Sequence, residues 1–146
     1  MAGPDLERLA VWRSFLAANA VIDRALTIAL DEERDMPLPW FEVLNALQAE
    51  GGRLRMMDLA ERVHASPSSL SRQLNRMQDE GYVRRDRGNG DDLRAVLVVL
   101  TRDGREIWRR ANTTYLRIVK RRFTSHLTES DVTYLNRVLG KVLEGG

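Results

Sequence analysis

The stretch SPSSLSRQLNRM, residues Ser66–Met77, decides the fold. Its opening serine can accept a hydrogen bond from a free backbone N–H, and the proline that follows has no N–H to leave unpaired. This pattern predicts a helix that begins there and ends at Gly81. One side of the helix is an apolar stripe made of Leu70, Leu74 and Met77. The other side carries hydrogen-bonding side chains, none of them acidic: Ser68, Ser69, Arg72, Asn75 and Arg76.

The neighbouring residues complete a winged helix-turn-helix pattern. A short helix is predicted over Met56–Val63, and a tight turn at His64–Ala65 joins it to the next helix. On the other side, the strand-like run Tyr82–Arg85 is followed by a turn-rich segment and then by the β-branched run Leu93–Leu100. The dipeptide Asn89–Gly90 lies between the two runs and is typical of a β-hairpin turn.

Two helices are predicted before this pattern. Apolar residues recur every three or four positions from Leu6 to Leu30, which indicates a long helix that the acidic run Asp31–Asp35 ends. A second helix begins near Pro39, a residue that suits the first turn, and ends at Gly51–Gly52. Its expected buried residues are Trp40, Val43, Leu44 and Leu47.

Two further helices are predicted after the hairpin. Thr101 is a candidate cap for a basic helix that extends to about Phe123. Thr128, with Asp131 three residues later, resembles a capping box and opens a last helix, which is expected to bury Leu135, Val138, Leu139 and Val142. We therefore expect a mostly α-helical fold with a small β-hairpin wing, as one domain over residues 1–146. The winged lobe spans about residues 36–101, and helices at about 5–30 and 102–146 flank it.

Composition excludes several classes of function. The 146 residues include no cysteine, which rules out disulfide scaffolds, thiolate metal sites and cysteine nucleophiles. No apolar stretch is long enough to span a bilayer, and the start of the chain does not resemble a signal peptide, so we expect a soluble cytoplasmic protein without membrane contact. His64 and His126 have no neighbouring metal ligands, no nucleophile lies near the acidic run Asp31–Asp35, and no glycine-rich phosphate loop is present. We expect no metal, no cofactor and no enzymatic activity.

Charge is unevenly distributed along the chain. Residues 1–50 carry 4 basic and 9 acidic side chains, whereas residues 101–122 carry 8 and 2. This asymmetry indicates that the central and following segments face an anion. Because 21 of the 23 basic residues are arginine, a GC-rich genome could also produce the excess, so the argument depends on where the arginines lie.

The polar helix face and the hairpin suit DNA chemically. A major groove admits one α-helix, and its base edges present donors and acceptors that Arg, Asn and Ser can read. Free N–H groups at the Ser66 end of the helix favour phosphate. Arg85 and Arg87, predicted at the tip of the hairpin, have the charge to enter a minor groove.

From Trp40 to Thr101 the sequence resembles the MarR family (multiple antibiotic resistance regulators), and the long first and last helices extend the likeness over nearly the whole chain. The matching segments are LPWFEVL (38–44), MDLAERV (57–63), SSLSRQLNRM (68–77), GYVRR (81–85) and DLRAVLVVLT (92–101). The family's Asp-x-Arg wing signature falls on Asp92 and Arg94, where the carboxylate is expected to hold the guanidinium in place. The chain departs from the family at Pro37, where many members have a Thr or Ser cap, and at Leu93, where a second Arg is frequent.

The resemblance implies a homodimer, formed through the first and last helices, that binds double-stranded DNA. Together with the residue patterns it assigns DNA contacts to Ser66, Ser68, Ser69, Ser71, Arg72, Asn75, Arg76, Arg85, Arg87, Asp92 and Arg94. It also implies a cleft for a small aromatic or lipophilic effector, near Trp12, Trp40 and Leu44.

Each assignment has a structural alternative. Asp92 and Arg94 could form an ion pair with only a structural role, and the tryptophans could simply pack in the core or at the dimer interface. For the whole chain, the alternative to a DNA-binding regulator, which we expect to be a repressor, is a winged-helix module that binds protein. The basic, non-acidic helix face favours the regulator, because a protein-binding face would more often be apolar or acidic.

Overall fold

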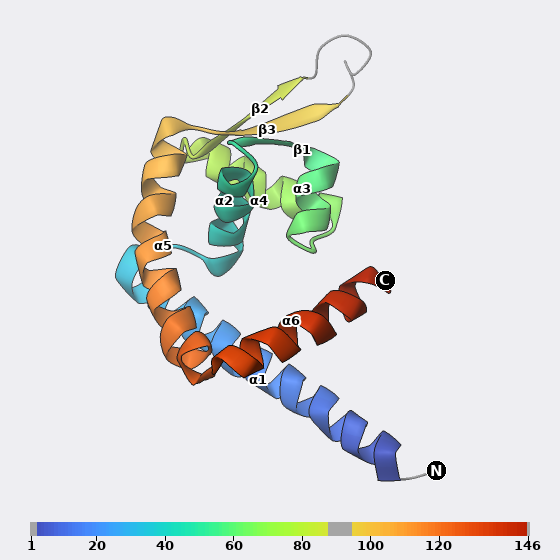
Figure 1. Cartoon of the computed structure of the whole chain (residues 1–146). Coiled ribbons are helices and arrows are strands. Elements are labelled where there is room, and N and C mark those ends of the chain that lie inside the picture. Colours follow the sequence, from blue (N-terminus) through green and yellow to red (C-terminus); the bar gives the residue numbers. More distant parts are fainter. Residues whose placement is uncertain (1–2, 88–94, 146) are drawn as a thin grey trace. The chain divides into compact units, whose positions relative to one another are not determined.

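The computed structural model describes residues 3–87 and 95–145 and confirms a mainly helical fold with a small antiparallel sheet (Figure 1). Its elements are α1 (Gly3–Arg34), α2 (Leu38–Ala49), β1 (Arg53–Arg55), α3 (Met56–Arg62), α4 (Pro67–Asp79), β2 (Val83–Arg87), β3 (Val96–Leu100), α5 (Arg102–Arg122), η2 (Thr124–His126) and α6 (Glu129–Glu144). The chain divides into two compact units, a terminal unit of residues 1–26 and 116–146 and a winged unit of residues 27–115. Among the described residues, no helix combines the length and the apolar character needed to span a bilayer.

The winged unit is built around a three-stranded sheet with the strand order β1-β3-β2. β2 and β3 form the predicted hairpin, with Val83 opposite Leu100 and Arg87 opposite Val96. The predicted turn dipeptide Asn89–Gly90 and the predicted start of the second strand at Leu93 lie in residues 88–94, outside the described residues. β1 was not predicted, because three residues are too few to show an alternating pattern, yet it pairs with β3 from Arg53 to Arg55.

The end of the first helix differs from the prediction. α1 does not end at the acidic run but continues to Arg34, because acidic side chains do not by themselves break a helix. The chain turns at Asp35, which has a φ of 50°, and Met36 N–H then donates to the Leu30 carbonyl at 3.1 Å. α2 begins at Leu38, and Pro37 occupies its cap position. The helix start therefore has no side-chain cap, as expected where proline replaces the Thr or Ser of many family members.

The core of the winged unit also corrects one predicted residue on α2. Trp40 is only half-buried and makes an edge contact with Tyr82, with 6.3 Å between ring centroids. The fully buried aromatic residue is Phe41, which stacks on Tyr115 at 4.5 Å. The predicted core residues Val43, Leu44 and Leu47 are buried as expected.

Three helix starts have the caps expected from the sequence. Ser66 Oγ accepts a hydrogen bond from Ser69 N–H at 3.2 Å, and Thr101 Oγ1 accepts one from Gly104 N–H at 3.0 Å. Thr128 and Asp131 form the complete capping box at the start of α6. The hydrogen bond from Thr128 N–H to the Asp131 carboxylate lowers the pKa of that side chain.

The first turn of α5 lies against the connection between α4 and β2. Thr101 Oγ1 donates to the Gly81 carbonyl at 2.6 Å, and Thr101 N–H donates to the Tyr82 carbonyl at 3.2 Å. Gly104 is buried at this contact, and a Cβ atom there would lie 2.0 Å from the Tyr82 carbonyl oxygen. The backbone segments can therefore approach this closely only while residue 104 is glycine.

We expect Gly104→Ala to lower the free energy of unfolding by about 1 to 3 kcal/mol, the usual range for overpacking. Intrinsic helix propensity predicts the opposite sign, since alanine favours a helix over glycine by about 1 kcal/mol. Gly140→Ala in α6, where a Cβ would meet nothing within 4 Å, is the matched control and should leave stability unchanged or raise it. Urea unfolding measures both variants. An equal or more stable Gly104→Ala protein would refute the close contact.

Candidate nucleic-acid interface

Helix α4 separates into the two faces expected from its sequence. Leu70, Leu74 and Met77 are fully buried in the winged unit. On the polar face, Ser68, Arg72, Asn75 and Arg76 are exposed, while Ser69 and Ser71 are half-buried. Neither Arg72 nor Arg76 is hydrogen-bonded or ion-paired to another residue that the structure describes. Their guanidinium groups thus remain available to an external ligand.

Some of the backbone N–H groups in the first turn of α4 are already hydrogen-bonded within the protein. Ser66 Oγ holds the Ser69 N–H, and Leu70 N–H donates to the Ser66 carbonyl at 2.9 Å. Pro67 has no N–H group. Of the first four helical residues, Ser68 therefore keeps the N–H that can meet a phosphate, and its hydroxyl lies 3.3 Å from that of Ser66. The predicted phosphate site therefore offers fewer free N–H donors than the sequence suggested.

Strand β2 directs its arginines in different directions. Arg84 is exposed, and its Nε donates to the Asp86 carboxylate at 3.1 Å. Arg85 is half-buried and reaches α4, where its Nε donates to Gln78 Oε1 at 2.9 Å and its Nη2 donates to Asn75 Oδ1. Arg87 is exposed at the end of the strand.

The placement of Arg85 corrects the expectation that it lies at the hairpin tip. The strand runs two residues further than predicted, to Arg87, so that Arg85 falls within it, opposite Val98. Its guanidinium is directed to α4. Asp92 and Arg94 lie outside the described residues, so the role expected for the wing signature stays a prediction.

A surface groove brings several of the predicted residues together. It has a volume of ≈ 380 Å³ and is lined by Ser71 of α4, by Arg85, Asp86 and Arg87 of β2, and by Met56 and Val96. The lining residues include two arginines and one aspartate, which gives the groove a net charge of +1. The groove has the positive excess that a DNA backbone would require.

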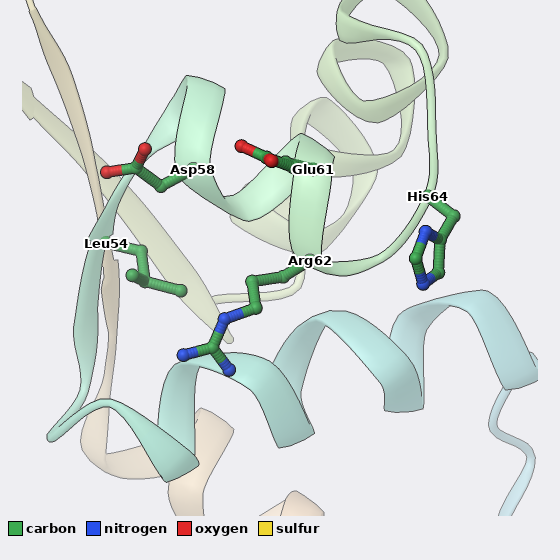
Figure 2. A pocket seen from close by; sticks show the side chains of 5 residues that line it. All are labelled: Leu54, Asp58, Glu61, Arg62 and His64. Carbon is green, nitrogen blue, oxygen red and sulfur yellow. The ribbon is translucent and has the colours of Figure 1, made fainter. Parts of the chain in front are cut away.

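A second pocket, of ≈ 520 Å³, lies on another part of the winged unit (Figure 2). Figure 2 shows Asp58, Glu61 and Arg62 on α3, Leu54 on β1 and His64 in the turn that follows α3. His64 has a φ of 56°, as the predicted tight turn requires, and Arg62 forms an ion pair with Glu50. The pocket contains none of the predicted DNA contacts, and its two carboxylates would repel phosphate.

The residues predicted to contact an effector are divided between the two units. Trp12 belongs to the terminal unit, where it is 54% exposed and stacks on Phe15 at 6.2 Å. Trp40 is half-buried in the winged unit, and Leu44 is fully buried there. Leu44 therefore packs in the core, and only the tryptophans offer surface to a ligand. Tyr115 stacks on Phe41, the residue that follows Trp40. Burial raises the pKa of Tyr115, and the Glu42 carboxylate raises it further.

The terminal unit exposes a large apolar surface. The last helix has no buried residue within the single chain, although the sequence predicted four. Val138 is 47% and Val142 66% exposed. In the terminal unit, the large exposed apolar residues of the two helices are Leu6, Leu9, Val11, Trp12, Phe15, Leu16 and Val21 on α1, and Val132, Tyr134, Val138, Val142 and Leu143 on α6. An unpartnered surface of this extent indicates an interaction site.

The sequence interpretation missed Gln78 and two contacts between α2 and α5. Gln78 follows Asn75 by three residues and so shares its face of α4, a spacing that could have identified it. Trp108 Nε1 donates to Asn45 Oδ1 at 3.0 Å, and Arg105 Nε donates to Gln48 Oε1 at 3.1 Å. Contacts between residues about sixty positions apart have no signal in a single sequence.

Comparison with known proteins is consistent with this geometry. The MarR family model matches residues 34–95. Over 75 residues the chain is 36% identical to the HTH-type transcriptional regulator YfiV of Bacillus subtilis, and the match covers 51% of this chain but only 46% of YfiV. The chain thus spans less than half of that curated relative.

The solved structures that match almost the whole chain include two regulators from Streptomyces coelicolor. AbsC, a MarR family transcriptional regulator from Streptomyces coelicolor, is 31% identical with a TM-score of 0.86, covering 94% of this chain and 92% of AbsC. Sco3205, a MarR family regulator from the same organism solved in complex with DNA, is 30% identical with a TM-score of 0.86, covering 96% of this chain and 88% of Sco3205. With this fold, this exposed helix face and these relatives, the chain belongs to the MarR family of transcriptional regulators.

Proposed function

We propose that the protein is a homodimeric, sequence-specific DNA-binding regulator that acts as a repressor on a pseudo-palindromic operator. The observation that carries this proposal is the exposed, donor-rich face of α4, on which Arg72 and Arg76 have no partner among the described residues. The relative Sco3205, whose structure contains DNA, supports it. Because the target is DNA, the proposed location is the cytoplasm.

Recognition divides between α4 and the wing. In this proposal α4 enters the major groove, where Ser68, Ser69, Arg72 and Asn75 reach base edges. Arg76 and the free N–H of Ser68 meet phosphates, and Arg87 at the end of β2 meets phosphate or a narrow minor groove. Phosphate contacts supply most of the affinity, and the base contacts supply specificity.

Dimerisation follows from the exposed apolar residues of α1 and α6. In a single chain these side chains would remain in contact with water, at a cost of about 25 cal/mol for each Å² of apolar surface. A second copy offers the same surface, and a two-fold interface is the commonest way for identical chains to cover it. The two copies of α4 would then read the two halves of a palindromic site.

The test of the DNA-binding proposal is a gel-shift assay on fragments of the protein's own genome over a salt series. We expect a subset of fragments to bind tightly and the logarithm of affinity to fall linearly with the logarithm of salt concentration. Binding to no fragment at about 50 mM salt would refute the proposal and favour a protein-interaction module. Equal binding to all fragments would refute sequence specificity alone.

We also propose that an aromatic or lipophilic carboxylate weakens operator binding. Such a ligand should quench tryptophan emission, because Trp12 and Trp40 offer exposed ring surface. Trp108, whose Nε1–H donates a hydrogen bond to Asn45 Oδ1, supplies the remaining tryptophan emission in the variant Trp12→Phe/Trp40→Phe. Titration of wild type and variant with salicylate and longer-chain acids measures the effect. A quenching signal that survives in the variant would remove these residues from the ligand site.

A further inference from the structure

Arg85 connects the wing to the recognition helix through two side-chain amides. Its Nε donates to Gln78 Oε1 at 2.9 Å, and its Nη2 donates to Asn75 Oδ1. Asn75 and Gln78 lie one helical turn apart on the exposed part of α4, and one guanidinium spans both of them. The bridge thus links β2 to two residues on the face that we assign to DNA.

The chemistry of the guanidinium determines how both amides are oriented. A guanidinium has five N–H donors and no acceptor, so the amide atom that faces it must be the carbonyl oxygen. The NH2 groups of Asn75 and Gln78 therefore point away from Arg85. This orientation follows from the hydrogen-bonding capacity of the groups and not from the assignment of oxygen and nitrogen atoms.

An asparagine amide reads adenine by accepting a hydrogen bond from N6 while it donates one to N7. In this protein the oxygen of Asn75 is already engaged by a cation, which also repels the positive hydrogens of the adenine amino group. The NH2 group, polarised by the same cation, becomes a stronger donor. Guanine presents two acceptors, O6 and N7, at its major-groove edge and places no donor there.

We propose that Arg85 is a positioning residue that converts Asn75 and Gln78 into donor-only readers, so that α4 favours guanine over adenine at the base pair that Asn75 faces. This inference rests on the proposed DNA-binding function and concerns how one part of that site selects its base. The wing thereby influences sequence choice in the major groove through a contact within the protein.

Arg84 provides a matched control on the same strand. It is the preceding residue of β2, carries the same charge, and donates to Asp86 instead of to α4. Arg84→Ala removes one positive charge from the neighbouring position of the same strand and leaves the Arg85 bridge intact. Arg85→Lys keeps the charge of residue 85 but loses the fork that spans two amides.

The experiment selects bound duplexes from a random library with the wild type, Arg84→Ala, Arg85→Ala, Arg85→Lys, Asn75→Ala and the double variant Asn75→Ala/Arg85→Ala. For Arg85→Ala we expect the ratio of adenine to guanine at one base pair of each half-site to rise about fivefold or more, the range for one base-reading contact. Arg85→Lys should show the same shift with an unchanged salt slope. Arg84→Ala should leave the ratio unchanged.

The double variant decides whether the effect passes through Asn75. In the Asn75→Ala background, loss of Arg85 should no longer change the ratio. Uniform weakening by Arg85→Ala without a change of base preference would overturn the inference and make Arg85 a phosphate contact. A shift of base preference that persists in the Asn75→Ala background would also overturn the inference. If the wild type enriches no sequence, the proposed function fails and this inference fails with it. If the wild type enriches a motif and neither Arg85→Ala nor Arg85→Lys changes that motif, only the inference is overturned. Circular dichroism confirms that each variant is folded.

Discussion

A single charge placed in the apolar surface of α1 or α6 is expected to weaken operator binding about 100- to 10,000-fold. Phe15→Glu on α1 and Val138→Glu on α6 are the variants of choice, because both side chains are exposed in the single chain and neither supports its core. A buried glutamate would prevent the two copies from associating, since an unpaired charge in an apolar interface is strongly unfavourable. Each monomer would then hold only half of the operator, and the gain in affinity from two linked contacts would be lost.

Sedimentation equilibrium measures the first step of this prediction. The wild type should sediment as a dimer, and each glutamate variant should approach the 16.7 kDa of one chain. Thr133→Glu adds the same charge to α6 on the side away from Val138 and Val142, and it should remain dimeric with normal affinity. A wild-type protein that is monomeric at micromolar concentration would contradict the dimer. Monomeric variants that bind the operator as tightly as the wild type would contradict the need for two half-sites.

The second prediction concerns the base-reading role of Arg72. This residue is exposed near the middle of the polar face of α4, opposite the buried side chains of Leu70, Leu74 and Met77. We expect its guanidinium to contact the O6 and N7 atoms of a guanine. Arg72→Ala should therefore cost about 1 to 3 kcal/mol of binding free energy for each half-site on the preferred operator, with little change on random DNA. Sequence choice should relax at one position of each half-site.

Arg87→Ala is the comparison that separates base reading from charge. Arg87 lies at the exposed end of β2, where attraction to phosphate or a narrow minor groove depends mostly on charge. Its loss should weaken binding to all sequences alike and lower the salt slope by roughly one unit per lost phosphate contact, hence about two per dimer. Both variants are measured on operator and random duplexes over a salt series.

The outcome for each arginine can contradict its assignment. If Arg72→Ala weakens operator and random DNA equally, Arg72 does not read a base. If Arg87→Ala changes neither affinity nor salt slope, the end of β2 does not touch DNA. Because Arg72 has no partner within the described part of the chain, its removal leaves no unsatisfied group behind, and the measured loss reports the contact with DNA.

Local sequence signals predict the existence of the main helices, their caps and the division of α4 into two faces. Ser66, Thr101 and the Thr128–Asp131 capping box act on backbone groups within four residues, so their effect can be read locally. The buried stripe of α4 follows from a helical period of 3.6 residues, which also places Arg72 and Arg76 on the opposite side. These same signals supported the family resemblance, which the solved relatives confirm.

Local signals do not show which segments meet in space, because such contacts depend on the path of the chain between them. β1 becomes a strand only because β3 pairs with it, and Phe41, not Trp40, enters the core because Tyr115 lies against it. Gly104 shows no special pattern in the sequence, yet the Tyr82 carbonyl leaves no room for a side chain there. From the sequence, Arg85 is predicted to be one more basic residue of the wing. The packing of β2 beside α4 places its guanidinium against the amides of Asn75 and Gln78.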